Sequence, residues 1–154
     1  MPEPAAATPP ELTIVRTFKA PPVLVFKAWT DPAHLVRWLG PSGFRAHSIA
    51  LDTRSGGAWR ACITSPDGDE NWMGGRYHEL SSPDRLVFTF AWESTGFETV
   101  VTITLRADGP GTVMTFHQAP FASDESRDSH DGGWTESFDR LAAFVAQDGK
   151  ESRP

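Results

Sequence analysis

The chain has 154 residues and a formal net charge of −6. This length suits one domain with its own core, and an acidic chain repels phosphate groups, which argues against nucleic acid as a partner. The single cysteine, Cys62, excludes an internal disulfide and favours a cytoplasmic location. No apolar stretch approaches the roughly 18 residues of a membrane-spanning helix.

The two ends of the chain differ in composition from the rest. Residues 1–10 contain four prolines and predict a disordered tail. They lack the basic flank and apolar run of a secretory signal. Residues 148–154 are polar and predict a frayed tail. We therefore expect one domain over residues 11–147.

The first elements are a strand and two short helices. Residues 11–19 alternate apolar and polar side chains, which predicts a strand. Pro22 and Pro32 suit the first turn of a helix and predict helices over residues 22–29 and 32–38. Asp31 is the expected N-cap of the second helix, and Gly40 follows its predicted end.

The middle of the chain predicts six further strands, separated by turn sequences rich in Gly, Pro, Asp and Ser. Their ranges are residues 44–52, 58–64, 72–80, 85–92, 98–107 and 112–119. Such short connections favour antiparallel pairing of consecutive strands.

The last predicted element is a helix over about residues 125–147. Its apolar residues recur at helical spacing and are Trp134, Phe138, Leu141, Ala142 and Val145. Gly132 and Gly133 predict either a break or a close backbone approach. This amphipathic helix is the only element long enough to cover the apolar face of the sheet, which gives an α+β fold.

Several segments carry a resemblance to a known family. They are APPVLVFKAWTDPAHLVRW at 20–38, GP at 40–41, DTRSGGAWR at 52–60, GRYHEL at 75–80, PDRLVFT at 83–89, GT at 111–112 and HDGGW at 130–134. In this order they resemble the homologues of the activator of the heat-shock protein 90 ATPase, within the START-like (SRPBCC) superfamily. The resemblance covers about residues 11–146.

The resemblance implies a helix-grip fold, in which a curved antiparallel sheet of six or seven strands wraps around the long C-terminal helix. The superfamily binds lipids, hormones and polyketides and includes some cyclases, so a hydrophobic ligand is expected between sheet and helix. The co-chaperone that gives the family its name has a second, N-terminal domain, for which this chain is too short.

Aromatic side chains are expected to line such a cavity, because a curved sheet cannot press against a straight helix along its whole length. Any single aromatic residue is more often part of the packed core than of a cavity wall. The candidate ligand-binding residues are Trp38, Trp59, Arg60, Trp72, Met73, Arg76, Tyr77, Phe88, Phe90, Val101, Met114, Phe116, His117, Trp134 and Phe138. Arg60 or Arg76 could pair with a ligand carboxylate, or either could be exposed or ion-paired.

No metal site and no cofactor are predicted. The five histidines (34, 47, 78, 117 and 130) show no spacing typical of metal ligands. No phosphate-binding loop or dinucleotide fingerprint occurs. Cys62 has no histidine near it in sequence and is interpreted as a small buried residue. His130 is interpreted as hydrogen-bonded near the start of the last helix.

Three functions remain open at this point. We favour a carrier or sensor that binds a small apolar or aromatic molecule, acting as a monomer or weak homodimer, with no catalytic residue assigned. The second is an enzyme of cyclase or hydrolase type in the same cavity, with His117 beside Glu136 or Asp139 as acid and base. The third is a co-chaperone-like module that uses its surface to bind a protein.

Overall fold

The structure is a computed structural model that describes the backbone of residues 8–151 and the side chains of residues 8–147. Its elements are β1 (Leu12–Phe18), α1 (Pro22–Thr30), α2 (Pro32–Leu35), β2 (Arg45–Leu51), β3 (Ala58–Thr64), β4 (Glu70–Ser81), β5 (Arg85–Trp92), β6 (Thr99–Asp108), β7 (Gly111–Ala119) and α3 (Asp124–Glu151). This order confirms the expected helix-grip architecture.

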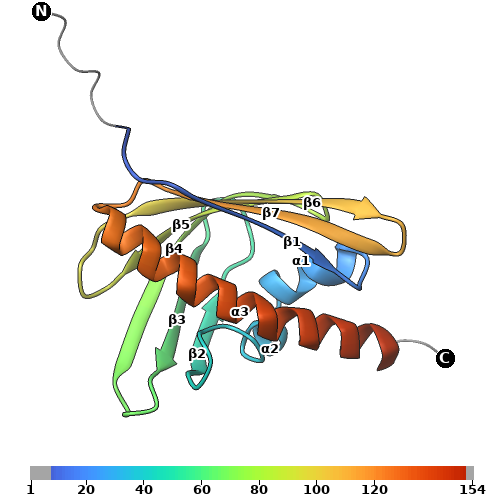
Figure 1. Ribbon diagram of the computed structural model, residues 1–154, viewed down its shortest axis with the longest axis horizontal. Helices are drawn as coiled ribbons and strands as arrows, with labels where there is room; N and C mark the ends of the chain where they lie inside the picture. The colour runs from blue at the N-terminus through green and yellow to red at the C-terminus, as the bar shows by residue number, and fades with distance from the viewer. Residues whose placement is uncertain (1–7, 152–154) are drawn as a thin grey trace, which may run out of the picture.

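The seven strands form one antiparallel sheet in the order β1-β7-β6-β5-β4-β3-β2. Strands β2 to β7 follow one another as a meander, and α1 and α2 link the two edge strands. Figure 1 shows α3 running across one face of this sheet, with α1 and α2 near its C-terminal half. We call this the inner face and the opposite one the outer face.

The sheet bends within β4, where two glycines allow unusually close backbone packing. Trp59 on β3 pairs with Gly75 and donates a hydrogen bond across it, from its indole Nε1 to the carbonyl oxygen of Thr89 on β5 (2.9 Å). A Cβ atom on Gly75 would lie 2.0 Å from that same oxygen. The pairing of β4 with β5 also shifts between Tyr77 and Glu79. Such irregularities let a sheet curve around a helix.

The inner face carries the core. Alternate residues of each strand point toward the helices, and aromatic side chains cluster where α1 meets α3. There Trp29 packs edge-on against Trp38 with ring centroids 4.7 Å apart, and it also contacts Phe116 and Phe138. Because α1 and α2 fill this end of the space under α3, ligand-sized space can remain only toward the other end.

The two later helices differ from the prediction at their ends. Asp31 caps α2 by accepting from the Ala33 N–H (2.9 Å), as expected. However, α2 ends at Leu35 and the chain continues in turns, which direct the Trp38 side chain into the core. Helix α3 runs unbroken through Gly132 and Gly133, so the predicted break is wrong. The alternative, a close backbone approach, is not found there either, because a Cβ on Gly133 would lie 3.6 Å from the Pro41 side chain, which is an ordinary van der Waals distance, and a Cβ on Gly132 would have open space.

The predicted tails lie mostly outside the described residues. Residues 1–7 and 152–154 are not described. The N–H of Phe121 donates to the carbonyl oxygen of Pro10 (2.9 Å), and the backbone of α3 continues to Glu151.

Candidate ligand-binding cleft

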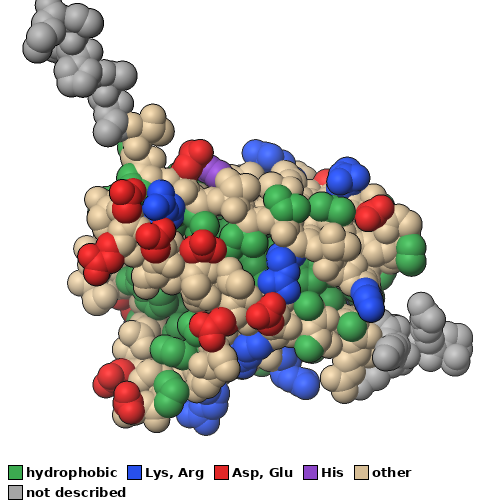
Figure 2. Space-filling model, viewed as in Figure 1, with side chains coloured by type: hydrophobic (Ala, Val, Ile, Leu, Met, Phe, Trp, Pro, Cys, Tyr) green, Lys and Arg blue, Asp and Glu red, His purple; other side chains and the backbone are tan. Residues whose placement is uncertain are grey.

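A cleft of about 440 Å³ opens between the N-terminal half of α3 and strands β3, β4 and β5. It lies at the end of the inner face that α1 and α2 leave uncovered. In the view of Figure 2, hydrophobic side chains reach the surface in this region, with acidic side chains around them. The cleft therefore results from the length of α3, which extends beyond the part of the core that the short helices fill.

The wall of the cleft is mainly apolar and aromatic. It is formed by Leu39, Phe44, Ile63, Met73, Phe90, Trp92 and Trp134. The strand residues among them are inward-facing positions of β3, β4 and β5, and Trp134 comes from α3 above them. An apolar ligand in this space would lose its contact with water and gain contact with aromatic rings and aliphatic carbon. Burial of its apolar area would therefore favour binding.

Trp134 is fixed by a buried chain of hydrogen bonds. Its indole Nε1 donates to Oε1 of Gln118 (2.8 Å), the Gln118 amide donates to Oγ1 of Thr99 (2.9 Å), and that hydroxyl donates to the carbonyl oxygen of Phe90 (3.0 Å). Gln118 is fully buried. The chain of bonds holds the indole in one orientation and satisfies polar groups that would otherwise be costly to bury.

Trp92 is fixed by a second interaction, with His130 of α3. The Trp92 Nε1 donates to Nε2 of His130 (2.9 Å), while Nδ1 of His130 donates to the carbonyl oxygen of Ser126 (2.9 Å). Burial lowers the pKa of His130 below its ordinary value, and the bond to Ser126 opposes this only in part. The imidazole is therefore neutral, and both of its nitrogens already have partners.

The polar lip of the cleft comes from the β3–β4 hairpin. The Asn71 amide donates to the carbonyl oxygens of Ile63 (3.3 Å) and Asp69 (3.2 Å), and the Asp69 N–H donates to Oγ of Ser65 (3.1 Å). These bonds engage the N–H donors of the lip. The polar atoms that remain for a ligand are acceptors, namely the Asp69 carboxylate and the Asn71 side-chain oxygen. No Lys or Arg is among the described residues that line the cleft.

The structure brings only part of the sequence-predicted set to this cleft. Met73, Phe90 and Trp134 lie on its wall. Five others are fully buried in the core, and these are Trp38, Val101, Met114, Phe116 and Phe138. Trp59, Tyr77 and Phe88 border a separate space of about 20 Å³, which has room for little more than one water molecule.

Four of the predicted residues lie on the outer face, so their assignment to an inner cavity is wrong. They are Arg60, Trp72, Arg76 and His117. The physical reason is strand alternation, since their neighbours (for example Trp59, Met73 and Phe116) occupy the inward positions.

The outer-face polar residues already have partners in the protein. Arg60 makes a two-pronged bond with Glu93 (2.9 and 3.0 Å) and lies 3.9 Å from the centre of the Trp72 ring. Arg76 donates to the carbonyl oxygen of Gly56, and His117 contacts Glu11. Arg60 is thus ion-paired with a carboxylate of the protein itself, which is the other alternative considered for it from the sequence.

The acid–base arrangement considered for an enzyme is not formed. His117 lies on the outer face, whereas α3 covers the inner one. Asp139 is ion-paired with Arg16 of β1 (2.8 Å). Glu136 is exposed on α3. The three residues therefore do not meet at one substrate position.

Several lining residues were not in the predicted set, among them Ile63, Asp69, Asn71 and His130. Trp92 is one of the aromatic residues that the sequence predicts around a cavity, and it follows Phe88 and Phe90 at alternate positions of one strand and therefore shares their face. Gln118 is a polar residue at an inward position of β7, and this pattern could have indicated that it is a buried hydrogen-bond partner of a residue on the inner face. The hairpin lip gave none, since turn residues show no periodicity.

A curved antiparallel sheet around a long C-terminal helix, with a cleft between them, defines a START-like helix-grip domain. Residues 19–146 match the family model of the Activator of Hsp90 ATPase homolog 1-like protein, and the chain belongs to this family. The fold of this family and superfamily is, in general, one that binds hydrophobic ligands. A search of curated proteins gave no match.

Solved structures agree with this family assignment. A protein from Chromobacterium violaceum is 30% identical and has a TM-score of 0.83, with 88% of this chain and 96% of that chain covered. The AHSA1 protein from Silicibacter pomeroyi is 27% identical with a TM-score of 0.82, covering 90% and 99%. CalU16 from Micromonospora echinospora, at 24% identity and a TM-score of 0.67 over 88% and 75%, shares the fold.

The described helices contain no stretch that is long and apolar enough to cross a bilayer.

Proposed function

We propose that the protein binds a small apolar or aromatic molecule in the cleft under α3 and acts as its carrier or sensor. The observation that carries the proposal is the cleft itself. Its volume of about 440 Å³ falls within the roughly 300–1,000 Å³ typical of small-molecule sites. An apolar wall with a few polar groups at one lip is also typical of such sites. We place this role in one domain over residues 11–147, in the cytoplasm.

The polar lip suggests which ligands fit. Asp69 and Asn71 bring acceptors to the lip, and no Lys or Arg is among the described residues that line the cleft, so a ligand with a hydroxyl, amide or amine donor is favoured over a carboxylate. This differs from one of the two alternatives left open by the sequence, in which Arg60 or Arg76 pairs with a ligand carboxylate. A rigid aromatic body with one donor group is the ligand class that the wall and lip favour together.

Binding is favoured over the two other functions. The titratable groups that line the cleft are Asp69 at the exposed lip and His130, whose nitrogens are both engaged. For a protein-docking module we would expect a continuous apolar patch. The exposed large hydrophobic residues in the described part of the chain are Val15, Val23 and Phe97, which belong to three separate segments.

The test is ligand binding with the cleft open or blocked. Ser129 lines the cleft from an exposed position on α3, so Ser129→Trp should place an indole across it. Glu136→Trp adds the same side chain at an exposed α3 position outside the cleft. Freshly purified protein is first examined by native mass spectrometry for a co-purified molecule, and binding of 1-naphthalenemethanol is then measured by calorimetry.

We expect Ser129→Trp to weaken binding by about tenfold or more, which corresponds to about 1.4 kcal/mol, and Glu136→Trp to bind like wild type. Equal affinity of the two variants, with circular dichroism showing both folded, would count against the cleft as the site. Absence of any saturable binding to the wild type and of any co-purified molecule would count against the function.

A further inference from the structure

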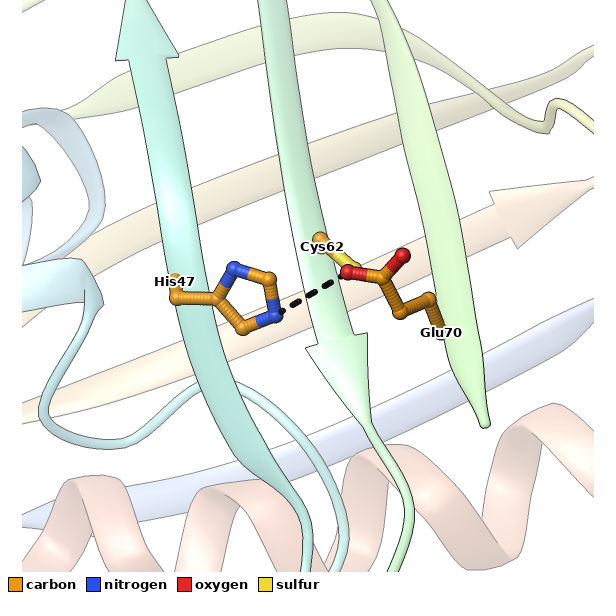
Figure 3. Close-up of side chains that lie close together, drawn as sticks. All are labelled: His47, Cys62 and Glu70. Atoms are coloured by element: carbon orange, nitrogen blue, oxygen red, sulfur yellow. Dashed lines mark ion pairs between the residues drawn. The ribbon is translucent and has the colours of Figure 1, made fainter. Parts of the chain in front are cut away.

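Three side chains that can bind a metal ion converge on the outer face of the sheet, on the side opposite the cleft. They are His47 of β2, Cys62 of β3 and Glu70 of β4, and Figure 3 shows them directed toward one another. One potential ligand atom from each lies within 4.8 Å of the other two. The Nε2 of His47 is 3.9 Å from Oε2 of Glu70.

Strand pairing explains why this cluster is not apparent from the order of residues in the chain. His47 pairs directly with Cys62 across β2 and β3, and Thr64, two residues further along β3, pairs with Glu70 of β4. Residues at i and i+2 share a face of a strand. The three ligands therefore meet on one face although they are far apart in sequence, which a search for short ligand spacings cannot detect.

The His47 ring is held in an orientation suited to binding a metal. Its Nδ1 is 2.9 Å from Oγ of Ser48, and its Nε2 is 2.7 Å from Oγ1 of Thr64. In the tautomer protonated at Nδ1, the Nδ1–H donates a hydrogen bond to Oγ of Ser48, and the lone pair of Nε2 points toward Thr64 and Glu70. Histidines that bind metals commonly donate their second N–H in this way. The β2 pairing shifts just after His47, and Ser48 has a positive φ of 55°.

We propose that His47, Cys62 and Glu70 form a zinc-binding site with three protein ligands and a fourth position open to solvent. Imidazole, thiolate and carboxylate together suit Zn²⁺ better than Mg²⁺ or Ca²⁺, which prefer oxygen ligands only. Cys62 is fully buried, while Glu70 is exposed and gives the ion access from water.

Binding requires small changes only. Bonds of about 2.0–2.3 Å in a tetrahedral site place ligand atoms roughly 3.3–3.8 Å apart, so the present separations of up to 4.8 Å shorten by at most about 1.5 Å. The Cys62 thiol releases its proton to solvent and binds as thiolate. The Thr64 hydroxyl rotates away from Nε2, which then binds the ion.

The site would link three strands at one edge of the sheet. Glu70 lies between Asp69 and Asn71, which form the lip of the cleft on the β3–β4 hairpin. Zinc would therefore fix the hairpin that carries this lip, and it should raise the melting temperature. The inference stands on the outer face alone and holds whether or not the cleft binds a ligand.

Cobalt titration tests the site, because a thiolate bound to Co²⁺ gives a charge-transfer absorption band in the near ultraviolet. The chain has one cysteine, so any such band reports Cys62. Reduced, metal-free protein is titrated with Co²⁺ and then with Zn²⁺, which should displace it. We expect a band that saturates at one ion per chain, disappears in Cys62→Ser, and requires at least about tenfold more Co²⁺ in His47→Gln and in Glu70→Gln.

His117→Gln is the matched control, since His117 contacts Glu11 on the same face without a cysteine. It should titrate like wild type. Circular dichroism establishes that each variant is folded, and size-exclusion chromatography excludes metal-linked dimers. No band in folded wild type at excess Co²⁺ would overturn the proposal, as would a band that His47→Gln and Glu70→Gln leave unchanged.

Discussion

The hydrogen bond between Trp92 and His130 makes one protonation state part of the folded structure. Nε2 of His130 accepts from the indole, so it cannot carry a proton while the bond exists. The ring also lies among apolar neighbours, including Phe121 at 5.0 Å and Phe90 at 5.9 Å between ring centroids. Burial therefore lowers the pKa of His130 below the ordinary 6.5.

A pH dependence of stability follows. Because the unfolded chain takes up the His130 proton at a higher pH than the folded chain does, the free energy of unfolding should fall as the pH drops below about 6.5. His130→Gln removes the titrating group, so we expect its loss of stability between pH 7.5 and pH 5.5 to be smaller than that of wild type. Urea unfolding at the two pH values measures this difference.

His117→Gln is the control, because it removes a histidine from the outer face and should keep the wild-type dependence. If His130→Gln lost as much stability as wild type over the same range, the neutral, accepting imidazole described here would be contradicted.

The side chains of the cleft could be predicted only in part, and β3 and β4 explain why. Trp59 faces inward and Trp72 outward, and Cys62 is fully buried on the outer face. Because large or buried residues occupy both faces of these two strands, alternation alone does not identify the inner face. In β6 and β7 the alternation is clean, and there only His117 was assigned to the wrong face.

Among the elements, β4 shows how a single backbone position determines the packing of neighbouring strands. Gly75 has no room for a side chain, since a Cβ would lie 2.0 Å from the Thr89 carbonyl oxygen, and Gly132 of α3 has no neighbour within 4 Å of such an atom. The same substitution should therefore have opposite effects at the two glycines.

We expect Gly75→Ala to destabilise the fold by about 2 kcal/mol or more through displacement of β5. Gly132→Ala should stabilise it by about 0.5–1 kcal/mol, because alanine is the better helix former. Chemical unfolding of both variants tests this pair. Similar free energies of unfolding for the two would show that β4 and β5 are not packed as described.

The existence of every element was predictable from the sequence, because strand alternation, prolines and turn residues are local signals. The residues at which the helices end were less predictable. Helix α2 stops at Leu35 because the chain must turn to bury Trp38. This reason is a tertiary contact, which local patterns do not contain.

At the scale of the whole molecule, the two faces of the sheet have different chemistry. The inner face meets α3 and holds an apolar cleft with an acceptor-rich lip, whereas the outer face carries ion pairs and the His47–Cys62–Glu70 cluster. The resemblance to the family predicted the layers correctly. It could not place the cleft, because that depends on how far α1 and α2 fill the space under α3.

Tryptophan indole N–H signals in a nitrogen–proton correlation spectrum would locate a bound ligand directly. Trp92 and Trp134 line the cleft, and Trp72 on the outer face is an internal control. On titration with 1-naphthalenemethanol, we predict saturable shifts of the Trp92 and Trp134 signals with that of Trp72 unmoved, and weaker shifts with 1-naphthoate. Shifts confined to Trp72, or none that saturate, would contradict binding in the cleft.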